Sequence, residues 1–356
     1  MQTTETISLI FELDACPVIG VKGRTVQFLN AAARAYYPDA IAGSAIRRLL
    51  PAHIALHQAS AFLATAKIHG AVHVVTVTSM PGLRLFRLEP VTTDAEFPDF
   101  LVPSDLFSME LGLATSFFSA HAAQLGDPTV LHYAARLKQT SDQLRRWVHN
   151  ASILQKLYRS KPSPAAHSID CAASLAAITE TIQLMLDRRQ IRLSLTVPES
   201  PCRVRIPSDL FEALVLNLLS NAVKNCADGA QISVNLTSET SNAHLSIQDA
   251  GCGFPERILT DVFHAYRTGT LPRSDQSHAG YGLPVCFAIT DAVNGSLLIE
   301  NNRGNGASVH IFLPLVSTGK AVLHSPDAPE PAANPDLWRI GISDALSDED
   351  YSPDKA

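Results

Sequence analysis

The sequence predicts a multidomain α+β protein, with a mixed α+β domain over residues 1–95, an antiparallel helical hairpin over 104–158 and an α/β sandwich over 168–315. Three observations lead to this prediction. The 356 residues are too many for one ordinary hydrophobic core. The spacing of the apolar residues changes from two to alternating three and four near residue 104. After residue 168, strand-like and helix-like segments alternate, as they do in α/β sandwiches.

Composition and charge narrow the class of protein. The net charge is −6 and no stretch combines clustered Lys and Arg with aromatic residues, so nucleic acid is not an expected partner. The six cysteines stand apart, without CxxC pairs or zinc-site spacing, as in reduced cytosolic proteins. The first residues lack the pattern of a signal peptide, and no uncharged apolar run reaches the roughly 18 residues that span a bilayer. We therefore expect a cytoplasmic protein without a membrane span.

The first domain opens with strand-like sequence. Residues 6–22 (TISLIFELDACPVIGVK) alternate apolar and polar side chains well enough to predict strands. Gly23 and Arg24 indicate a hairpin turn before a further strand over 25–29, and Asn30 starts a helix.

A pair of strands closes this domain. Residues 72–80 (VHVVTVTSM) and 83–91 (LRLFRLEPV) are predicted to pair in antiparallel fashion across Pro81 and Gly82. The order of elements, with PVIGVKGRTVQFLNAAA entering a helix and a final FRLEPV strand, resembles a PAS sensor domain over residues 1–95. The resemblance implies a sensory role.

No residue of the first domain stands out as a cofactor ligand. There is no cysteine in a flavin-adduct context, and His53 and His57 are equally compatible with surface positions on a helix. The signal that the domain detects therefore stays open.

The middle of the chain predicts two helices joined by a tight turn. Helical periodicity runs over 104–125 and 129–158 and is interrupted at Gly126, Asp127 and Pro128. One stripe on the second helix has the spacing of a helix-bundle seam, and its members are Val130, Ala134, Leu137, Ser141, Leu144, Val148 and Ala151. Because a single hairpin has two apolar faces and one partner helix, we expect a homodimer with a four-helix bundle.

Two polar segments flank the third domain. Residues 160–167 (SKPSPAAH) are short and contain proline, as a linker does. The tail, residues 319–356, has five prolines and eight acidic residues against three basic ones, which predicts a largely disordered segment. Within the tail, residues 336–346 (DLWRIGISDAL) are a possible docking helix.

Four short motifs follow one another in the third domain. The first, NLLSNAVKN, lies on a predicted helix and places Asn217, Asn221 and Lys224 at positions i, i+4 and i+7 on one face. Amide oxygens can ligate Mg²⁺, and an ammonium group can neutralise phosphate.

The second motif, DAGCGFP, follows a predicted strand. A buried carboxylate at Asp249 can accept a hydrogen bond from an adenine amino group. Gly251 and Gly253 would let the backbone come close to the ring of the ligand.

The third motif is predicted to begin a loop over the nucleotide, and the fourth to form a turn that binds phosphate. In VFHAYRTG, the residues Phe263, Tyr266 and Arg267 begin a loop that could close over a nucleotide. In GYGLPV, Gly280 and Gly282 lead into a helix, and backbone N–H groups at such a turn bind phosphate.

Each motif alone occurs by chance in many chains, whereas the ordered set is specific. It resembles the N, G1, F and G2 boxes of the sensor histidine kinases, over residues 168–315. The resemblance implies ATP and Mg²⁺ as ligands, with the magnesium ion held by Asn221 and the adenine by Asp249. It also implies that the phosphates lie against Lys224 and the loop from Gly280 to Gly282.

The fourth motif departs from the family at one position. The family pattern continues GxGLGL, whereas Pro284 stands here at the third glycine and removes one backbone donor. Because proline is tolerated in a first helical turn, we expect ATP binding to survive.

The histidine that accepts phosphate in these kinases has no counterpart in the expected place. Aligning the family pattern SHELRTPL with SMELGLAT matches Ser108, Glu110 and Leu111 and puts Met109 in the acceptor slot. A thioether cannot be phosphorylated, so only Glu110 remains, as a candidate base. His121 on the same predicted helix is a rival acceptor, although its spacing favours a partly buried bundle histidine.

Three functions are compatible with these patterns. The leading hypothesis is a sensor histidine kinase homologue of cytoplasmic two-component signalling that binds Mg·ATP, with Met109 in place of the acceptor. The first alternative is a catalytically silent pseudokinase scaffold that binds ATP and a response regulator or partner kinase. The second is a kinase that acts in trans on a separate protein. The expected partners are a second copy of the chain and a response regulator or partner kinase, and autophosphorylation stays open.

Overall fold

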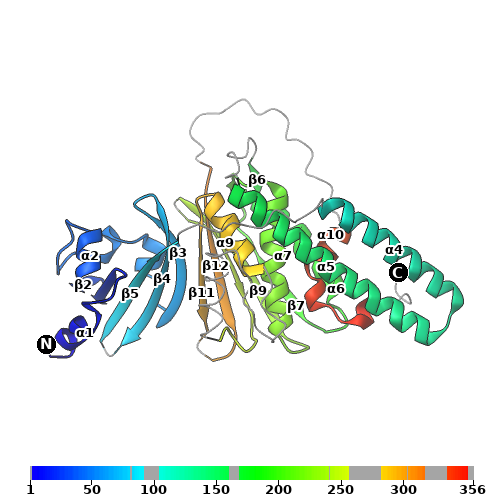
Figure 1. Ribbon diagram of the computed structural model, residues 1–356, viewed down its shortest axis with the longest axis horizontal. Helices are drawn as coiled ribbons and strands as arrows, with labels where there is room; N and C mark the ends of the chain where they lie inside the picture. Colours follow the sequence, from blue (N-terminus) through cyan, green and yellow to red (C-terminus); the bar gives the residue numbers. More distant parts are fainter. Residues whose placement is uncertain are drawn as a thin grey trace.

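A single ten-stranded sheet runs through the first and third domains, and the helical hairpin lies beyond it. The computed structural model describes residues 2–80, 82–91, 104–159, 168–239, 241–255, 282–302, 304–316 and 335–351. In Figure 1 the first domain, the third domain and the hairpin follow one another along the longest axis of the molecule.

The first domain is built around antiparallel strands and short helices. The strands are β1 Val18–Lys22, β2 Thr25–Leu29, β3 Ala61–Ile68, β4 Ala71–Met80 and β5 Leu83–Pro90, and the helical segments are α2 Ala31–Tyr36, η1 Ile46–Arg48 and α3 Ala52–Ala55. Asn30 caps α2, because its side-chain oxygen accepts from the backbone N–H of Ala33 at 2.8 Å. The predicted hairpin turn at Gly23 is confirmed, and so is the strand pair around residue 81, with Met80 opposite Leu83. The PAS resemblance stays a prediction.

The start of the first domain differs from the prediction. The residues expected to form a strand from position 6 belong to helix α1 (Gln2–Phe11), and only the end of the predicted segment is β1. The spacing of Ile7 and Phe11 fits both interpretations. Residues four apart lie on one face of a strand and also on one face of a helix. Packing against Val18 and Phe28 decides for the helix.

The third domain contributes the other half of the sheet. Its strands are β7 Arg192–Thr196, β9 Gln231–Ser238, β10 Asn242–Gln248, β11 Ser296–Asn301 and β12 Ala307–Pro314, and a separate pair is β6 Ile169–Asp170 with β8 Arg203–Val204. The strand order of the large sheet is β2-β1-β5-β4-β3-β11-β12-β10-β9-β7. The two halves join where β3 pairs antiparallel with β11, so that Leu63 lies opposite Ile299. No sequence pattern predicts this pairing, because the two strands are distant in the chain.

Different layers cover the two faces of β11 and β12. Helices α6 Cys171–Met185, α7 Ser208–Asn225 and α9 Gly282–Ala292 share one core with side chains such as Leu297 and Ile299. Leu298 and Phe312 point to the other face, as the period of two in a strand requires, and join the core of the first domain beside Ile54. The first domain therefore covers the sheet face opposite to the helices.

His53 of α3 is one of the contacts between the two domains. Its ring stacks on Phe312 with ring centroids 4.3 Å apart, and its Nε2 lies 2.7 Å from Oγ of Ser296. Burial and the nearby His244 and His57 lower the pKa of His53 to about 4, so the ring is neutral at physiological pH. His53 thus packs between domains and is not a solvent-facing side chain.

The hairpin segment consists of α4 Ser104–Leu125 and α5 Pro128–Arg159, which pack side by side (Figure 1). Asp127 caps α5, since its Oδ1 accepts from the backbone N–H of Thr129 at 2.8 Å. Gly126 has a φ of 65°, which glycine adopts without a steric penalty. Within the described ranges, no helix combines the length and apolar character needed to cross a membrane.

The predicted apolar stripe of the second helix is divided between two environments. Ala134, Ser141 and Ala151 are buried, whereas Leu137 and Leu144 are exposed to solvent. Part of the stripe is therefore covered within one chain, and part of it remains on the surface.

Residues 335–351 are folded against the third domain. Helix α10 Pro335–Gly341 and the short turns η2 Ser343–Ala345 and η3 Asp348–Tyr351 contact α5, α6 and α7. Trp338, Ile342 and Leu346, four residues apart, are all buried. The prediction of a disordered tail is therefore wrong for this segment, while the docking helix is confirmed. The tail is acidic overall, but its apolar residues have the spacing of a helix. That helix is stable only when it packs on the surface of the third domain.

Candidate functional site

The first motif lies at the end of helix α7. The helix begins after Pro207 with Asp209 in its first turn, where a carboxylate complements the helix dipole, and apolar residues fill most of its length. Asn221 and Asn225 come one turn apart near its C-terminus, and the side-chain amide of Asn225 donates to the carbonyl of Asn221 at 2.8 Å. This arrangement leaves two amide groups beside the open end of the helix.

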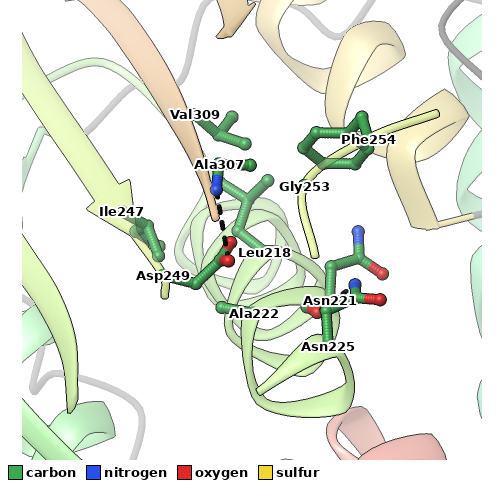
Figure 2. Close-up of a pocket in the computed structure, with 10 residues that line it drawn as sticks. All are labelled: Leu218, Asn221, Ala222, Asn225, Ile247, Asp249, Gly253, Phe254, Ala307 and Val309. Carbon is green, nitrogen blue, oxygen red and sulfur yellow. Dashed lines mark hydrogen bonds between the residues drawn. The ribbon is translucent and has the colours of Figure 1, made fainter. Parts of the chain in front are cut away.

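A pocket lies between the end of α7 and the ends of β10 and β12 (Figure 2). Its walls combine apolar side chains with a carboxylate and two amides, and the lining residues are Leu218, Asn221, Ala222, Asn225, Ile247, Asp249, Gly253, Phe254, Ala307 and Val309. Asn221 and Asp249, two of the residues singled out in the sequence, both line this pocket. A flat heteroaromatic group fits such a wall composition, because apolar contact covers its faces and polar groups meet its edge.

Asp249 is a half-buried carboxylate of this pocket. Its Oδ1 accepts from the backbone N–H of Gly251 at 2.8 Å and from that of Ala307 at 3.2 Å. Within the described part of the chain, both of these bonds go to Oδ1, so Oδ2 is available to a donor on a ligand. Burial raises the pKa of Asp249, and the two backbone hydrogen bonds oppose that rise.

Two glycines allow the backbone to close around Asp249. A Cβ on Gly306, where φ is +94°, would lie 2.0 Å from the carbonyl oxygen of Asp249. A Cβ on Gly251 would lie 2.3 Å from the carbonyl oxygen of Asn225. The close approach at Gly251 is therefore to the end of α7, which holds the second motif against the first.

Phe254 forms one side of the pocket, and an amide clamp fixes its backbone. Oδ1 of Asn301 accepts from the N–H of Phe254 at 2.7 Å, and Nδ2 of Asn301 donates to its carbonyl at 2.8 Å. Sequence reasoning singled out neither these residues nor Asn225. Asn225 could have been identified from its i+4 spacing from Asn221, and Phe254 from its position inside the second motif. Asn301 carried no local signal, because its role depends on the position of β11.

Asn217 lies in a different environment from Asn221. Its side chain is 3% exposed and contacts α5, where its Oδ1 accepts from Arg146 at 3.0 Å and from Asn150 at 2.9 Å. Its Nδ2 donates to the carbonyl of Ala213 at 2.8 Å. The structure therefore brings Asn217 to the contact between α5 and α7 and not to the pocket.

The other predicted ligand residues are distributed around the pocket or lie outside the described residues. Lys224 is half-buried on α7 and does not line the pocket. Gly282 is the first residue of α9, beside Asn217, and Pro284 stands in the first turn of this helix. The remaining four, Phe263, Tyr266, Arg267 and Gly280, fall in the range 256–281, outside the described residues.

The predicted acceptor segment lies on α4, away from the pocket lining. Met109 is 54% exposed, and Glu110 and His121 are exposed as well. His121 is therefore on the surface of the single chain. The exposed face of α4 presents the thioether of Met109.

Comparison with known proteins identifies the third domain. Residues 207–317 match the family model of the histidine kinase-, DNA gyrase B- and HSP90-like ATPases. These residues form an ATPase domain of the histidine kinase type.

Individual relatives are sensor kinases. The chain is 31% identical over 122 residues to the sensor protein KdpD of Escherichia coli, an alignment that covers 34% of this chain and 14% of KdpD. It is 30% identical over 142 residues to the adaptive-response sensory kinase SasA of Synechococcus sp., covering 39% of this chain and 37% of SasA. The structure of the mycobacterial sensor histidine kinase MprB aligns with 42% of this chain and 97% of its own, at 25% identity and a TM-score of 0.35. The chain thus matches well under two thirds of the length of both curated relatives.

Proposed function

We propose that the chain binds Mg·ATP in the pocket formed by α7, β10 and β12, with Asp249 accepting from the adenine amino group. The observation that carries this proposal is the position of Asp249, a carboxylate with one oxygen held by backbone N–H groups and surrounded by apolar walls. Asn221 at the end of α7 suits Mg²⁺, since amide oxygens are hard ligands and the neighbouring Asn225 adds a second amide. Bound magnesium would neutralise the phosphate charge, and Lys224 and the loop from Gly280 to Gly282 would hold the phosphates.

Calorimetry of ATP binding to the full chain tests this assignment. Asp249→Asn places a donor where the adenine amino group donates, so the affinity should fall by about 5- to 150-fold, equivalent to roughly 1–3 kcal/mol. Asn221→Ala should weaken binding when magnesium is present and have little effect in EDTA. Asp187→Asn, a change of an exposed carboxylate outside the pocket, is the matched control. Unchanged affinity in both pocket variants would refute the proposal.

We further propose that the whole chain is a homologue of the sensor histidine kinases in two-component signalling, with a PAS-like first domain as its input. The order of strands and short helices in the first domain supports that part of the proposal, and the ATPase domain with its sensor kinase relatives supports the rest. A response regulator or a partner kinase would be the recipient of the signal.

Met109 favours a second candidate, a pseudokinase scaffold whose ATP-binding domain controls conformation without phosphotransfer. The acceptor slot presents a thioether at an exposed position on α4, and a thioether cannot carry a phosphoryl group. His121, the rival acceptor, is twelve residues further along the helix, about 18 Å at the rise of an α-helix. An ATPase domain docked beside Met109 could not also reach His121 without moving along the hairpin.

Incubation with γ-labelled ATP separates the two candidates. We expect little or no acid-labile, base-stable phosphate on the wild-type chain, and some on Met109→His, because only this variant presents a nitrogen beside Glu110. Label on the wild type that disappears in His121→Gln would instead identify a working kinase with its acceptor at His121.

A further inference from the structure

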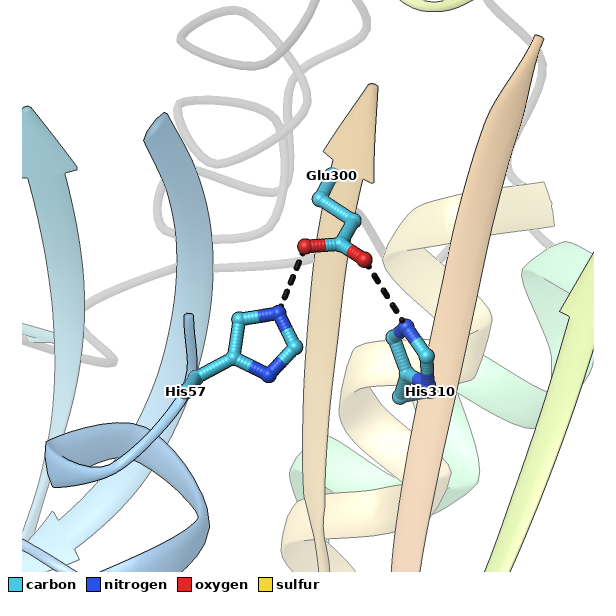
Figure 3. A group of neighbouring side chains, drawn as sticks. All are labelled: His57, Glu300 and His310. Carbon is cyan, nitrogen blue, oxygen red and sulfur yellow. Dashed lines mark hydrogen bonds and ion pairs between the residues drawn. The ribbon is translucent and has the colours of Figure 1, made fainter. Parts of the chain in front are cut away.

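Two histidines and a glutamate meet at the junction of the first and third domains. His57 follows α3 in the first domain, Glu300 lies on β11 and His310 lies on β12 (Figure 3). Nε2 of His57 is 2.5 Å from Oε2 of Glu300, and Nε2 of His310 is 3.4 Å from Oε1 of the same carboxylate. One ligand atom from each residue lies within 4.8 Å of the other two. His57 is therefore brought from a distant part of the chain to present a donor atom beside those of Glu300 and His310.

The backbone holds these residues in place before any ligand arrives. Paired residues of neighbouring strands point to the same face of a sheet, and Leu298 pairs with His310. The face that the first domain covers therefore carries residues 298, 300, 308 and 310. Arg84 of β5 donates to the backbone carbonyl of His57 and thereby fixes the segment after α3. A site assembled on strands and an anchored loop needs little rearrangement to bind an ion.

A second layer of side chains orients His310. Nδ1 of His310 is 3.1 Å from Nε2 of His244, and Nδ1 of His244 is 3.5 Å from a carboxylate oxygen of Glu239. With a metal ion bound and Nδ1 of His244 protonated toward Glu239, Nε2 of His244 would accept from Nδ1–H of His310. Nε2 of His310 would then have its lone pair free for the ion in place of its present bond to Glu300. Metal-binding histidines are commonly oriented by such a partner on the ring nitrogen that does not bind the ion.

We propose that His57, Glu300 and His310 form a binding site for a transition-metal dication, Zn²⁺ in particular, that links the first domain to the ATPase domain. Two imidazoles and a carboxylate are the three protein ligands of open zinc sites, in which water takes the fourth position. Imidazole nitrogen selects Zn²⁺ over Mg²⁺ and Ca²⁺, so this site is chemically distinct from the magnesium position at the nucleotide. The three side chains are 16–22% exposed, which gives an ion and a water molecule access.

The site needs a small rearrangement to hold zinc. At zinc–ligand distances of about 2.0–2.1 Å, tetrahedral donors lie roughly 3.3 Å apart, so side-chain rotation would bring the more distant ligand atoms together and move His57 and Glu300 slightly apart. A bound ion would replace the direct bonds from the histidines to Glu300. Since His57 belongs to one domain and the other ligands to the second, the ion would stabilise their contact, independently of ATP.

Zinc titration of the chelator-treated full chain by calorimetry tests the site. We expect one high-affinity site, weakened at least 100-fold by His57→Ala, Glu300→Gln or His310→Ala. His244→Phe should weaken binding by about 10- to 100-fold, as loss of an orienting partner does in other zinc proteins. His132→Ala, which removes an exposed histidine on α5, is the control and should leave the affinity unchanged. Equal zinc affinity in the wild type and in the three ligand variants would overturn the proposal.

A measurement on the wild-type chain keeps the test independent of variant folding. Co²⁺ bound by these ligands should show the intense visible absorption of a four-coordinate ion, and an equal concentration of Zn²⁺ should displace it. Only the weak absorption of hydrated, six-coordinate Co²⁺ would show that the cluster is an ion pair and not a metal site. ATP affinity measured on the same samples shows whether the nucleotide pocket is intact, so failure of the metal proposal is distinguishable from failure of the proposed function.

Discussion

The position of Asp249 depends on the turn between β11 and β12. The backbone N–H of Asp249 donates to the carbonyl of Ala307 at 3.0 Å, and the side chain of Asn302 donates to the carbonyl of Asp249 at 3.2 Å. The turn contains two glycines with positive φ. A Cβ on Gly306 would collide with Asp249, whereas a Cβ on Gly304 would meet no atom within 4 Å.

We expect these two glycines to respond differently to alanine. Gly304→Ala costs only the strain of a positive φ, roughly 1–3 kcal/mol of the free energy of unfolding. Gly306→Ala adds overpacking against Asp249, roughly another 1–3 kcal/mol, and should also lower the affinity for ATP. Urea unfolding and ATP titration of both variants give the comparison. Equal losses of stability, with ATP affinity retained in Gly306→Ala, would contradict the tight packing of Gly306 on Asp249.

Among the helices, α5 is attached to α7 by a buried polar network. One Nη atom of Arg146 lies 2.8 Å from both Oγ of Ser220 on α7 and Oδ2 of Asp344 on η2. The other Nη atom donates to Asn217 at 3.0 Å. The hairpin, the helix of the first motif and the C-terminal segment therefore share one buried cation.

Removing this cation should loosen all three elements. Arg146→Met keeps much of the side-chain volume but removes the ion pair with Asp344 and one of the two donors to Oδ1 of Asn217, and breaking a buried ion pair in this way costs roughly 3–5 kcal/mol. Arg188→Met is the control, because its partner Glu349 is 79% exposed and such a surface pair contributes roughly 0–1 kcal/mol. Denaturant unfolding compares the two. If Arg146→Met destabilised the chain no more than Arg188→Met, the network would not be the attachment of α5.

At the scale of the whole molecule, both helices of the hairpin carry exposed apolar side chains. Met109, Leu113 and Phe117 are spaced four apart on α4 and are all more than half exposed. On α5 the exposed series is Tyr133, Leu137, Leu144 and Trp147. Large exposed apolar side chains on both helices indicate a contact with another protein, and we propose that a second copy of the chain covers them in a four-helix bundle.

Light scattering should report a homodimer at micromolar concentration. The double substitution Leu113→Glu and Phe117→Glu should shift the chain to a monomer, because charged groups would be buried in the bundle. Leu184→Glu on α6 changes a leucine that is also exposed, at 75%, and should leave the dimer intact. A monomeric wild-type chain would count decisively against the bundle.

The sequence alone was sufficient to predict the ATPase domain, and it singled out three residues that line the pocket, Asn221, Asp249 and Gly253. Asn221, Asp249 and their glycines stand in short motifs, and a motif is readable because the residues that shape a turn or a helix end are neighbours in the chain. The same local rules predicted the cap at Asn30, the turn at Gly23 and the helices on either side of Asp127.

Tertiary structure decided everything that depends on residues meeting from distant parts of the chain. It made residues 2–11 a helix, joined β3 to β11, folded residues 335–351 onto the third domain and turned Asn217 toward Arg146. The cluster of His57, Glu300 and His310 arises in the same way. Local spacing fixes which face of an element a side chain occupies, whereas the partner on that face is determined by long-range packing, which a single sequence does not record.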